Sequence, residues 1–145
     1  MIDRVLIVCV GNICRSPMAE AVLRYQLAKD RKIVVESAGL AAMAGSPIDP
    51  LAESVLTEHG LSARSHLARQ IEGTLVESAD VVFTMDKRQR AALLALAPWA
   101  RRKVVLLGKW QGDAEIPDPY HQQRPAFEHA YQMIDSAIRS WHEHL

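Results

Sequence analysis

The feature that most constrains the fold of this chain is an apolar run near the N-terminus that leads directly into a helix start. Residues 4–8 read RVLIV, a β-branched and apolar composition typical of a parallel strand covered on both faces. Ser16 and Pro17 then provide a helix start, with a capping hydroxyl followed by proline at the first helical position. A buried strand that is followed by a short loop and a helix indicates the first part of a βαβ unit.

The loop between this strand and this helix carries a cysteine and an arginine in the pattern Cys-x5-Arg-Ser, residues 9–16. Successive backbone N–H groups of such a loop can surround a phosphate, and the following helix directs its positive end at the same point. Arg15 adds a planar fork that matches two phosphate oxygens. The same positive field stabilises a Cys9 thiolate, which can attack the phosphorus of a bound phosphate monoester.

The Cys-x5-Arg pattern has a simpler interpretation when it is taken alone. A cysteine is most often a small buried hydrophobe, and an arginine most often lies on the surface. The surroundings favour the phosphate site, because a strand precedes the loop, a helix start follows it, and Gly11 and Asn12 permit the torsions of a tight turn. The sequence therefore predicts an anion-binding loop with Cys9 as its nucleophile.

Size and charge narrow the possible classes of protein. With 145 residues, we expect one domain spanning residues 1–145. The 17 basic and 17 acidic side chains cancel, so no overall charge attracts the protein to nucleic acid. No run approaches the ~18 apolar residues of a membrane span, and the N-terminus lacks a secretory pattern, so we expect a cytoplasmic protein that is not embedded in a membrane. Two cysteines on one loop fit a reactive thiol better than a disulfide scaffold.

Apolar periodicity along the rest of the chain predicts alternating strands and helices. Further strands are expected at 32–35, 80–85 and 103–107, and helices at about 17–29, 50–59, 72–78, from the cap Asp86 to Ala97, and from Pro125. The alternation predicts an α/β fold, a doubly wound parallel sheet of four strands in the order 2-1-3-4 with helices on both faces. The last helix carries an apolar stripe that should pack on the core, formed by Phe127, Tyr131, Ile134, Ile138 and Trp141.

The segment VCVGNICRSPMAE resembles the active-site segment of the low-molecular-weight protein tyrosine phosphatases. VESAGL at 35–40, SHLARQI at 65–71 and IPDPY at 116–120 agree with the family in the same order, so the resemblance covers essentially the whole chain. It is strongest with bacterial members that act with exopolysaccharide or capsule tyrosine kinases. The resemblance implies a phosphotyrosine protein phosphatase that works through a phosphocysteine and needs no metal or other cofactor.

Such a reaction needs an acid that protonates the departing tyrosine oxygen. Asp118 lies between Pro117 and Pro119, which stiffen the loop and can hold the carboxyl group over the leaving group. An Asp-Pro pair taken alone is more often a turn residue. The resemblance assigns Asp118 as the general acid, and later as the base that activates water, beside the catalytic Cys9 and Arg15.

The resemblance also assigns supporting roles around the loop. Ser16 is expected to donate to the Cys9 sulfur, and Leu40 and Tyr120 are expected to form walls of the substrate pocket. A leucine at position 40, where eukaryotic-type members tend to carry an aromatic residue, indicates a more open pocket. The rest of the expected site consists of the phosphate-binding loop residues Val10, Gly11, Asn12, Ile13 and Cys14, and of Ser37 and His66, which support the loop through hydrogen bonds with Asn12.

Cys14 leaves two interpretations open. It is either a small packing residue or a second thiol that captures oxidised Cys9 as a reversible disulfide. The basic groups at Lys87, Arg88 and Arg90 and at 101–103 are expected to be solvated surfaces.

Three alternative functions differ in the residues that they need. Arginine phosphatases of this fold carry threonine at the position of Ile13, so an apolar residue there favours tyrosine. Arsenate reductases of this fold relay a disulfide through downstream cysteines, and none follows Cys14. A phosphotyrosine-binding module has no need of a nucleophile and an acid together. As partner, the resemblance implies a membrane tyrosine autokinase whose dephosphorylation regulates polysaccharide production.

Overall fold

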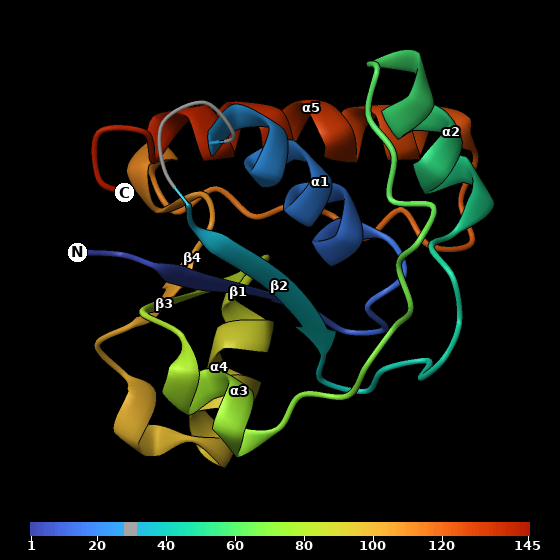
Figure 1. The fold of residues 1–145 in the computed structure, drawn as a ribbon. Coiled ribbons are helices and arrows are strands. Elements are labelled where there is room, and N and C mark those ends of the chain that lie inside the picture. The colour runs from blue at the N-terminus through green and yellow to red at the C-terminus, as the bar shows by residue number, and fades with distance from the viewer. Residues whose placement is uncertain (28–31) are drawn as a thin grey trace.

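A four-stranded parallel sheet forms the middle layer of the molecule (Figure 1). The computed structural model describes residues 1–27 and 32–145. The sheet order is β2-β1-β3-β4, which confirms the order predicted from the sequence. The strands are β1 (Arg4–Cys9), β2 (Val34–Gly39), β3 (Val81–Thr84) and β4 (Val104–Leu106).

Helices cover both faces of the sheet, as the apolar run in β1 predicts. Because side chains alternate along a strand, Val5 and Ile7 face one side while Leu6 and Val8 face the other. The first face carries α1 (Arg15–Leu27), α2 (Pro50–Glu58) and α5 (Arg124–Ser140), and the second face carries α3 (Gly73–Ser78) and α4 (Lys87–Leu96). Each face therefore has its own apolar core.

The start of α1 differs from the prediction. The helix was expected at 17–29 with Ser16 as its cap, but it begins at Arg15, so Ser16 lies inside the first turn. The expectation that Ser16 caps the helix was wrong because its hydroxyl contacts Cys9 and Asn12 instead. Residues 28–29 of the predicted helix lie outside the described residues.

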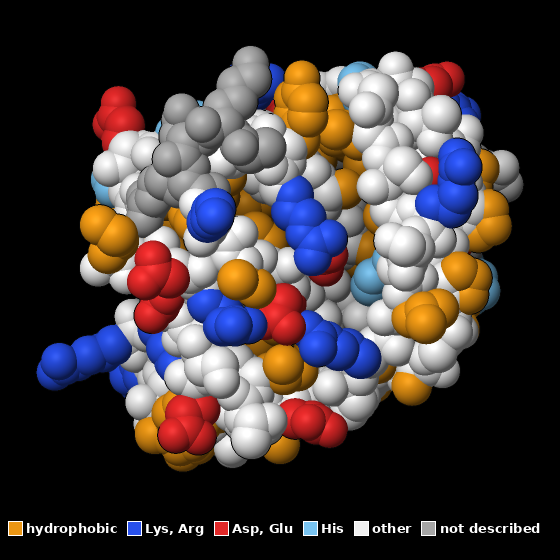
Figure 2. Space-filling view, viewed as in Figure 1, with side chains coloured by type: hydrophobic (Ala, Val, Ile, Leu, Met, Phe, Trp, Pro, Cys, Tyr) orange, Lys and Arg blue, Asp and Glu red, His pale blue; other side chains and the backbone are white. Residues whose placement is uncertain are grey.

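Strand β2 also differs from the expected 32–35. It begins at Val34 and continues to Gly39, paired with β1 along its whole length. The polar residues Glu36 and Ser37 do not end the strand, because Glu36 forms ion pairs with Arg4 and Arg69. β2 is an edge strand, and Figure 2 shows basic and acidic side chains interleaved on the face that it presents. Charged side chains protect such an edge against pairing with another chain.

The remaining elements agree closely with the sequence. Asp86 caps α4 by accepting a hydrogen bond from the Gln89 N–H at 2.8 Å. The long loop 108–124 contains one short 3-10 helix, Lys109–Gln111, and another 3-10 helix, Pro98–Ala100, precedes β4. The predicted apolar stripe of α5 is buried along its length. No helix in the described ranges is both long enough and apolar enough to span a membrane.

Candidate active site

The candidate site forms where the carboxyl end of β1 meets the start of α1. Cys9 is the last residue of β1, and residues 10–14 form the loop that leads to α1. The chain moves from β1 to β2 on one side and then to β3 on the other side, so β1 lies at the switch point of the sheet. Ligands of such sheets bind beyond the carboxyl ends of the strands at this point.

Hydrogen bonds turn the carbonyl groups of this loop toward the rest of the protein. The carbonyl oxygens of residues 9–13 each accept a hydrogen bond from another segment; the donors are the N–H groups of Leu40, Ala41, Met43 and Asp49, and His66 Nε2. In the described part of the chain, the N–H groups of residues 10–14 have no acceptor. Because its carbonyl groups are engaged and its N–H groups are available, the loop can receive an anion.

Asn12 holds the loop in its bent conformation. Its φ of 60° lies in the left-handed region, and the residue is fully buried. The side-chain nitrogen donates to the hydroxyls of Ser16 at 2.8 Å and Ser37 at 3.0 Å, and the side-chain oxygen accepts from the Arg69 N–H at 2.9 Å. His66 Nε2 donates to the Asn12 carbonyl at 2.6 Å. The structure thus brings together Asn12, Ser37 and His66, the residues expected to support the loop.

Gly39 allows the end of β2 to approach the same loop. A Cβ atom at this position would lie 2.5 Å from the Val10 carbonyl oxygen, well inside van der Waals contact. Only glycine fits such an approach between two backbone segments. The loop is therefore supported by hydrogen bonds at Asn12 and by close packing at Gly39.

The hydroxyl of Ser16 lies beside the Cys9 sulfur. The Cys9 Sγ and Ser16 Oγ atoms are 2.9 Å apart, and both residues are buried. Ser16 Oγ already accepts a hydrogen bond from Asn12, so its own proton is available to the sulfur. Ser16 is therefore placed to donate a hydrogen bond to the Cys9 sulfur, as the resemblance implies.

Arg15 is buried and fixed from three directions. Its guanidinium donates to the Ile116 carbonyl at 2.8 Å and pairs with Asp86 at 3.3 Å. A third contact, 3.6 Å long, joins it to Asp118. The side chain is only 4% exposed, so its position is defined by these partners rather than by solvent. A charged fork held this firmly is suited to bind phosphate oxygens.

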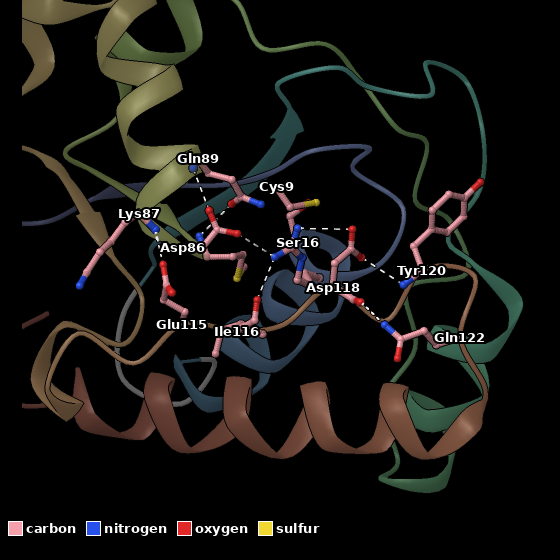
Figure 3. Close-up of polar contacts among 12 residues, drawn as sticks. Cys9, Ser16, Asp86, Lys87, Gln89, Glu115, Ile116, Asp118, Tyr120 and Gln122 are labelled. Carbon is pink, nitrogen blue, oxygen red and sulfur yellow. Dashed lines mark hydrogen bonds and ion pairs between the residues drawn. The ribbon is translucent and has the colours of Figure 1, made fainter.

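Asp118 and Tyr120 approach the same point from the loop before α5. The Asp118 carboxylate accepts a hydrogen bond from the Tyr120 N–H at 3.1 Å, and Gln122 Nε2 donates to the Asp118 carbonyl at 2.8 Å. Figure 3 shows Asp118 between Tyr120 on one side and Asp86 and Glu115 on the other. The Asp118 side chain is 48% exposed, so it can exchange a proton with solvent.

These residues surround one pocket of about 200 Å³. It is lined by Cys9, Val10, Gly11, Ile13, Cys14, Arg15, Ala41, Met43, Asp118 and Tyr120. Leu40, expected as a wall, is not among these lining residues and packs against the core on the α3 and α4 face of the sheet. The expectation for Leu40 was wrong because the turn after β2 places Ala41 and Met43 beside the loop instead.

Cys14 lines the pocket but is only 4% exposed, and both cysteines are free thiols. Burial, and secondarily the negative charge of Asp49, raises the pKa of the Cys14 thiol well above its ordinary value. The burial of Cys14 and the raised pKa of its thiol support its interpretation as a packing residue. In residues 1–27 and 32–145, no three His, Cys, Asp or Glu side chains are grouped so that they could hold a metal ion.

Sequence reasoning missed two features of this site. Asp86 was expected only as a helix cap, but its second carboxylate oxygen faces Arg15. Its position two residues after the end of β3, the neighbour of β1, was the available signal, because the carboxyl ends of adjacent parallel strands lie together. No comparable signal identified Ala41 and Met43, since small and flexible residues in a loop carry no distinctive pattern.

Comparisons with known proteins agree over the whole length of the chain. The sequence model of the family described as low molecular weight phosphotyrosine protein phosphatase matches residues 4–145. The chain is 45% identical over 145 residues to the low molecular weight protein-tyrosine-phosphatase Wzb of Salmonella typhi, covering 100% of this chain and 95% of that protein.

Solved structures give the same result. Vibrio vulnificus Wzb in complex with benzylphosphonate superposes with a TM-score of 0.95 at 40% identity, and the match covers 100% of both chains. The YwlE arginine phosphatase from Geobacillus stearothermophilus also matches, with a TM-score of 0.90 at 31% identity over 97% of this chain and 91% of that one.

The family model and a relative of this identity both extend over nearly the whole chain. They confirm the resemblance that the sequence motifs indicate, and the sheet order is that of the predicted fold. The chain belongs to the low molecular weight phosphotyrosine protein phosphatase family.

Proposed function

We propose that this protein hydrolyses phosphotyrosine in proteins through a phosphocysteine intermediate at Cys9. One observation carries the proposal: Cys9, Arg15 and Asp118 line a single pocket of about 200 Å³, although they come from opposite ends of the chain. The pocket thus combines a nucleophile, a cation that binds phosphate oxygens and a carboxyl group that can transfer a proton.

In the first step, the Cys9 thiolate attacks phosphorus. The sulfur–phosphorus bond forms while the bond from phosphorus to the tyrosine oxygen breaks, and its electron pair moves to that oxygen. Asp118 supplies the proton that the departing oxygen takes up. The N–H groups of the loop and the Arg15 guanidinium stabilise the oxygens of the transferring group; one such preorganised donor contributes about 3 kcal/mol in other enzymes.

In the second step, water hydrolyses the phosphocysteine. Asp118 is now a carboxylate. It takes a proton from the water while the water oxygen bonds to phosphorus. The sulfur–phosphorus bond breaks, and its electrons return to the Cys9 sulfur as the thiolate. Ser16 lies 2.9 Å from this sulfur and stabilises it as a leaving group by donating a hydrogen bond from its hydroxyl.

The pocket walls favour tyrosine as the leaving group. Ile13, Met43 and Tyr120 all line the pocket, so an aromatic ring that enters it meets apolar contacts. The fold alone does not distinguish phosphotyrosine from phosphoarginine as the substrate, because an arginine phosphatase has the same fold with a TM-score of 0.90. The inference therefore depends on Ile13, Met43 and Tyr120 rather than on topology.

We further propose that the protein acts in the cytoplasm on a membrane tyrosine autokinase, and that it thereby regulates exopolysaccharide or capsule production. The support is the resemblance of the active-site segment to bacterial members with this role and the identity of 45% to Wzb. The chemistry of the site uses no cofactor.

The test is phosphate release from matched peptides that carry phosphotyrosine, phosphoserine or phosphoarginine. We expect turnover on phosphotyrosine alone, no turnover by Cys9→Ser or Arg15→Ala, and a rate reduced about 100-fold or more by Asp118→Ala, which retains phosphate binding. Near-normal turnover by Cys9→Ser would exclude the mechanism. Preference for phosphoarginine would overturn the substrate assignment, and binding without turnover would instead support a phosphotyrosine-binding module.

A further inference from the structure

A second groove lies beside the catalytic pocket, on the other side of Asp118. It has a volume of about 490 Å³ and is lined by Arg15, Asp86, Arg88, Glu115, Ile116, Pro117 and Asp118. Arg15 and Asp118 line both hollows, so the groove and the pocket are direct neighbours. Figure 3 shows the same relation, with Asp86, Glu115 and Ile116 on the side of Asp118 away from Tyr120. A peptide whose phosphotyrosine fills the pocket can therefore place a neighbouring side chain in this groove.

The acidic side chains of the groove already have partners. Asp86 pairs with Arg15 and caps α4, and the Glu115 carboxylate accepts the Lys87 N–H at 2.8 Å. Asp118 contacts Arg15 at 3.6 Å and carries a proton when it acts as the acid.

Arg88 lines the same groove but has no such partner among the described residues. It is exposed, and within residues 1–27 and 32–145 its guanidinium forms no ion pair or hydrogen bond. Its neighbour in the basic cluster, Arg90, turns to the sheet instead and donates to the Val104 carbonyl at 2.8 Å. The basic cluster at the start of α4 is thus not one uniform solvated surface, because Arg88 alone lines the groove. Of the two arginines that line the groove, Arg15 is engaged by Asp86 and Asp118, so Arg88 is the lining cation that remains available to an acidic group of a substrate.

We propose that Arg88 is a specificity-determining residue that binds a carboxylate side chain, aspartate or glutamate, near the phosphotyrosine of the substrate. The inference rests on the proposed function, since it concerns the substrate of the same site. A guanidinium matches a carboxylate with two parallel hydrogen bonds. Glu115 lines the same groove, and its charge repels an acidic residue that is not paired with Arg88. The preference should therefore depend on Arg88 itself.

The position of the groove limits which substrate residues can reach it. An extended peptide rises about 3.3 Å per residue, and its side chains alternate in direction. Because the groove lies on one side of the pocket, the preference should be confined to one side of the phosphotyrosine, within about two residues of it.

The experiment compares phosphotyrosine peptides that carry Glu, Gln or Lys one or two residues before, or one or two residues after, the phosphotyrosine. For the unchanged protein we expect kcat/KM about threefold higher with Glu than with Gln on one side only, through a lower KM, because the contact exists before and during reaction. The ratio should approach one at high salt. An equal rate for Glu and Gln at every position would overturn the proposal.

Two variants at position 88 test whether the preference comes from Arg88 itself or from the overall charge of the protein. In Arg88→Gln the ratio of Glu to Gln should fall to about one, and in Arg88→Glu the preference should change to Lys. Arg102→Glu makes the same charge change at an exposed arginine before β4, at the opposite end of the sheet, and should keep the original ratio. If Arg102→Glu alters the ratio as strongly as Arg88→Glu, the effect is one of net charge and the proposal fails.

Hydrolysis of p-nitrophenyl phosphate, which has no flanking residue, distinguishes this inference from the proposed function. If the unchanged protein does not hydrolyse it, the proposed function fails. If hydrolysis proceeds and the peptides show no dependence on Arg88, only the present inference fails.

Discussion

At the scale of single residues, Asp86 joins the architecture of the protein to its chemistry. One carboxylate oxygen accepts the Gln89 N–H at 2.8 Å and so starts α4, while the other lies 3.3 Å from the Arg15 guanidinium. The same side chain therefore has a structural role and a positioning role. Two substitutions can separate them, because asparagine keeps the capping oxygen but loses the charge, whereas alanine loses both.

We predict that Asp86→Asn lowers kcat about tenfold, because an amide in place of the second oxygen no longer holds Arg15 in its productive geometry. Its free energy of unfolding should stay within about 0.5 kcal/mol of the original, since asparagine caps helices as well as aspartate. Asp86→Ala should show a similar loss of kcat and lose about 1 kcal/mol of stability as well. Steady-state kinetics and urea unfolding measure the two effects separately, and an unchanged kcat in Asp86→Asn would refute the positioning role.

At the scale of elements, the end of β2 and the loop after β1 depend on each other. Four backbone hydrogen bonds from residues 40–49 reach the carbonyl groups of the loop, and Gly39 lets the backbones approach. Strand β2 thus contributes to the site although, among its side chains, only Ser37 takes part in the network that supports the loop.

We predict that Gly39→Ala destabilises the protein by about 1–3 kcal/mol and reduces activity, because its Cβ would force the Val10 carbonyl, 2.5 Å away, to shift. The matched control is Gly73→Ala at the start of α3, where a Cβ would meet nothing within 4 Å. There alanine should leave activity unchanged and stabilise the helix slightly. Thermal unfolding and aryl phosphate turnover of both variants test the idea, which fails if the two glycines respond alike.

At the scale of the whole molecule, two carboxylates connect segments that are distant in sequence and make stability depend on pH. Hydrogen bonds from Arg69, and next from Arg4, lower the pKa of Glu36 below its ordinary value, against the opposing effect of burial. The backbone N–H groups of Asp3 and Arg4 lower the pKa of Asp80. Because both pKa values are lower in the folded state, folding favours the charged forms, and their contribution is present in full above the ordinary values.

We therefore predict that the melting temperature falls as the pH drops below about 5, when these carboxylates take up protons and release their partners. Glu36→Gln and Asp80→Asn should each reduce this fall, since the group that titrates is removed. Glu143→Gln, a change at an exposed residue, serves as the control and should leave the pH dependence as it was. Calorimetry from pH 7 to about pH 3 provides the measurement, and identical profiles for all variants would contradict the assignment.

Much of this molecule could be predicted from its sequence because local signals agree with the global fold. The β-branched run before Cys9 and the alternation of apolar segments give the sheet order, and the loop motif with the Asp-Pro segment predicts which residues share a site. The features that escaped prediction depend on partners brought in by tertiary structure. Spacing predicts that Asp86 caps a helix, but not that Arg15 lies beside it. Likewise, the sequence does not show that the turn after β2 places Ala41 and Met43 in the pocket instead of Leu40.

The contact between Arg15 and the Ile116 carbonyl spans 101 positions in the sequence, and it has a consequence for biosynthesis. Cys9 and Arg15 are synthesised early, whereas Ile116, which fixes Arg15, and the acid Asp118 are added about 100 residues later. Until those residues have been added, the growing polypeptide carries the Cys9 thiol without the partners that catalysis requires. The pocket therefore assembles only after Ile116 and Asp118 have been synthesised and have folded against the loop.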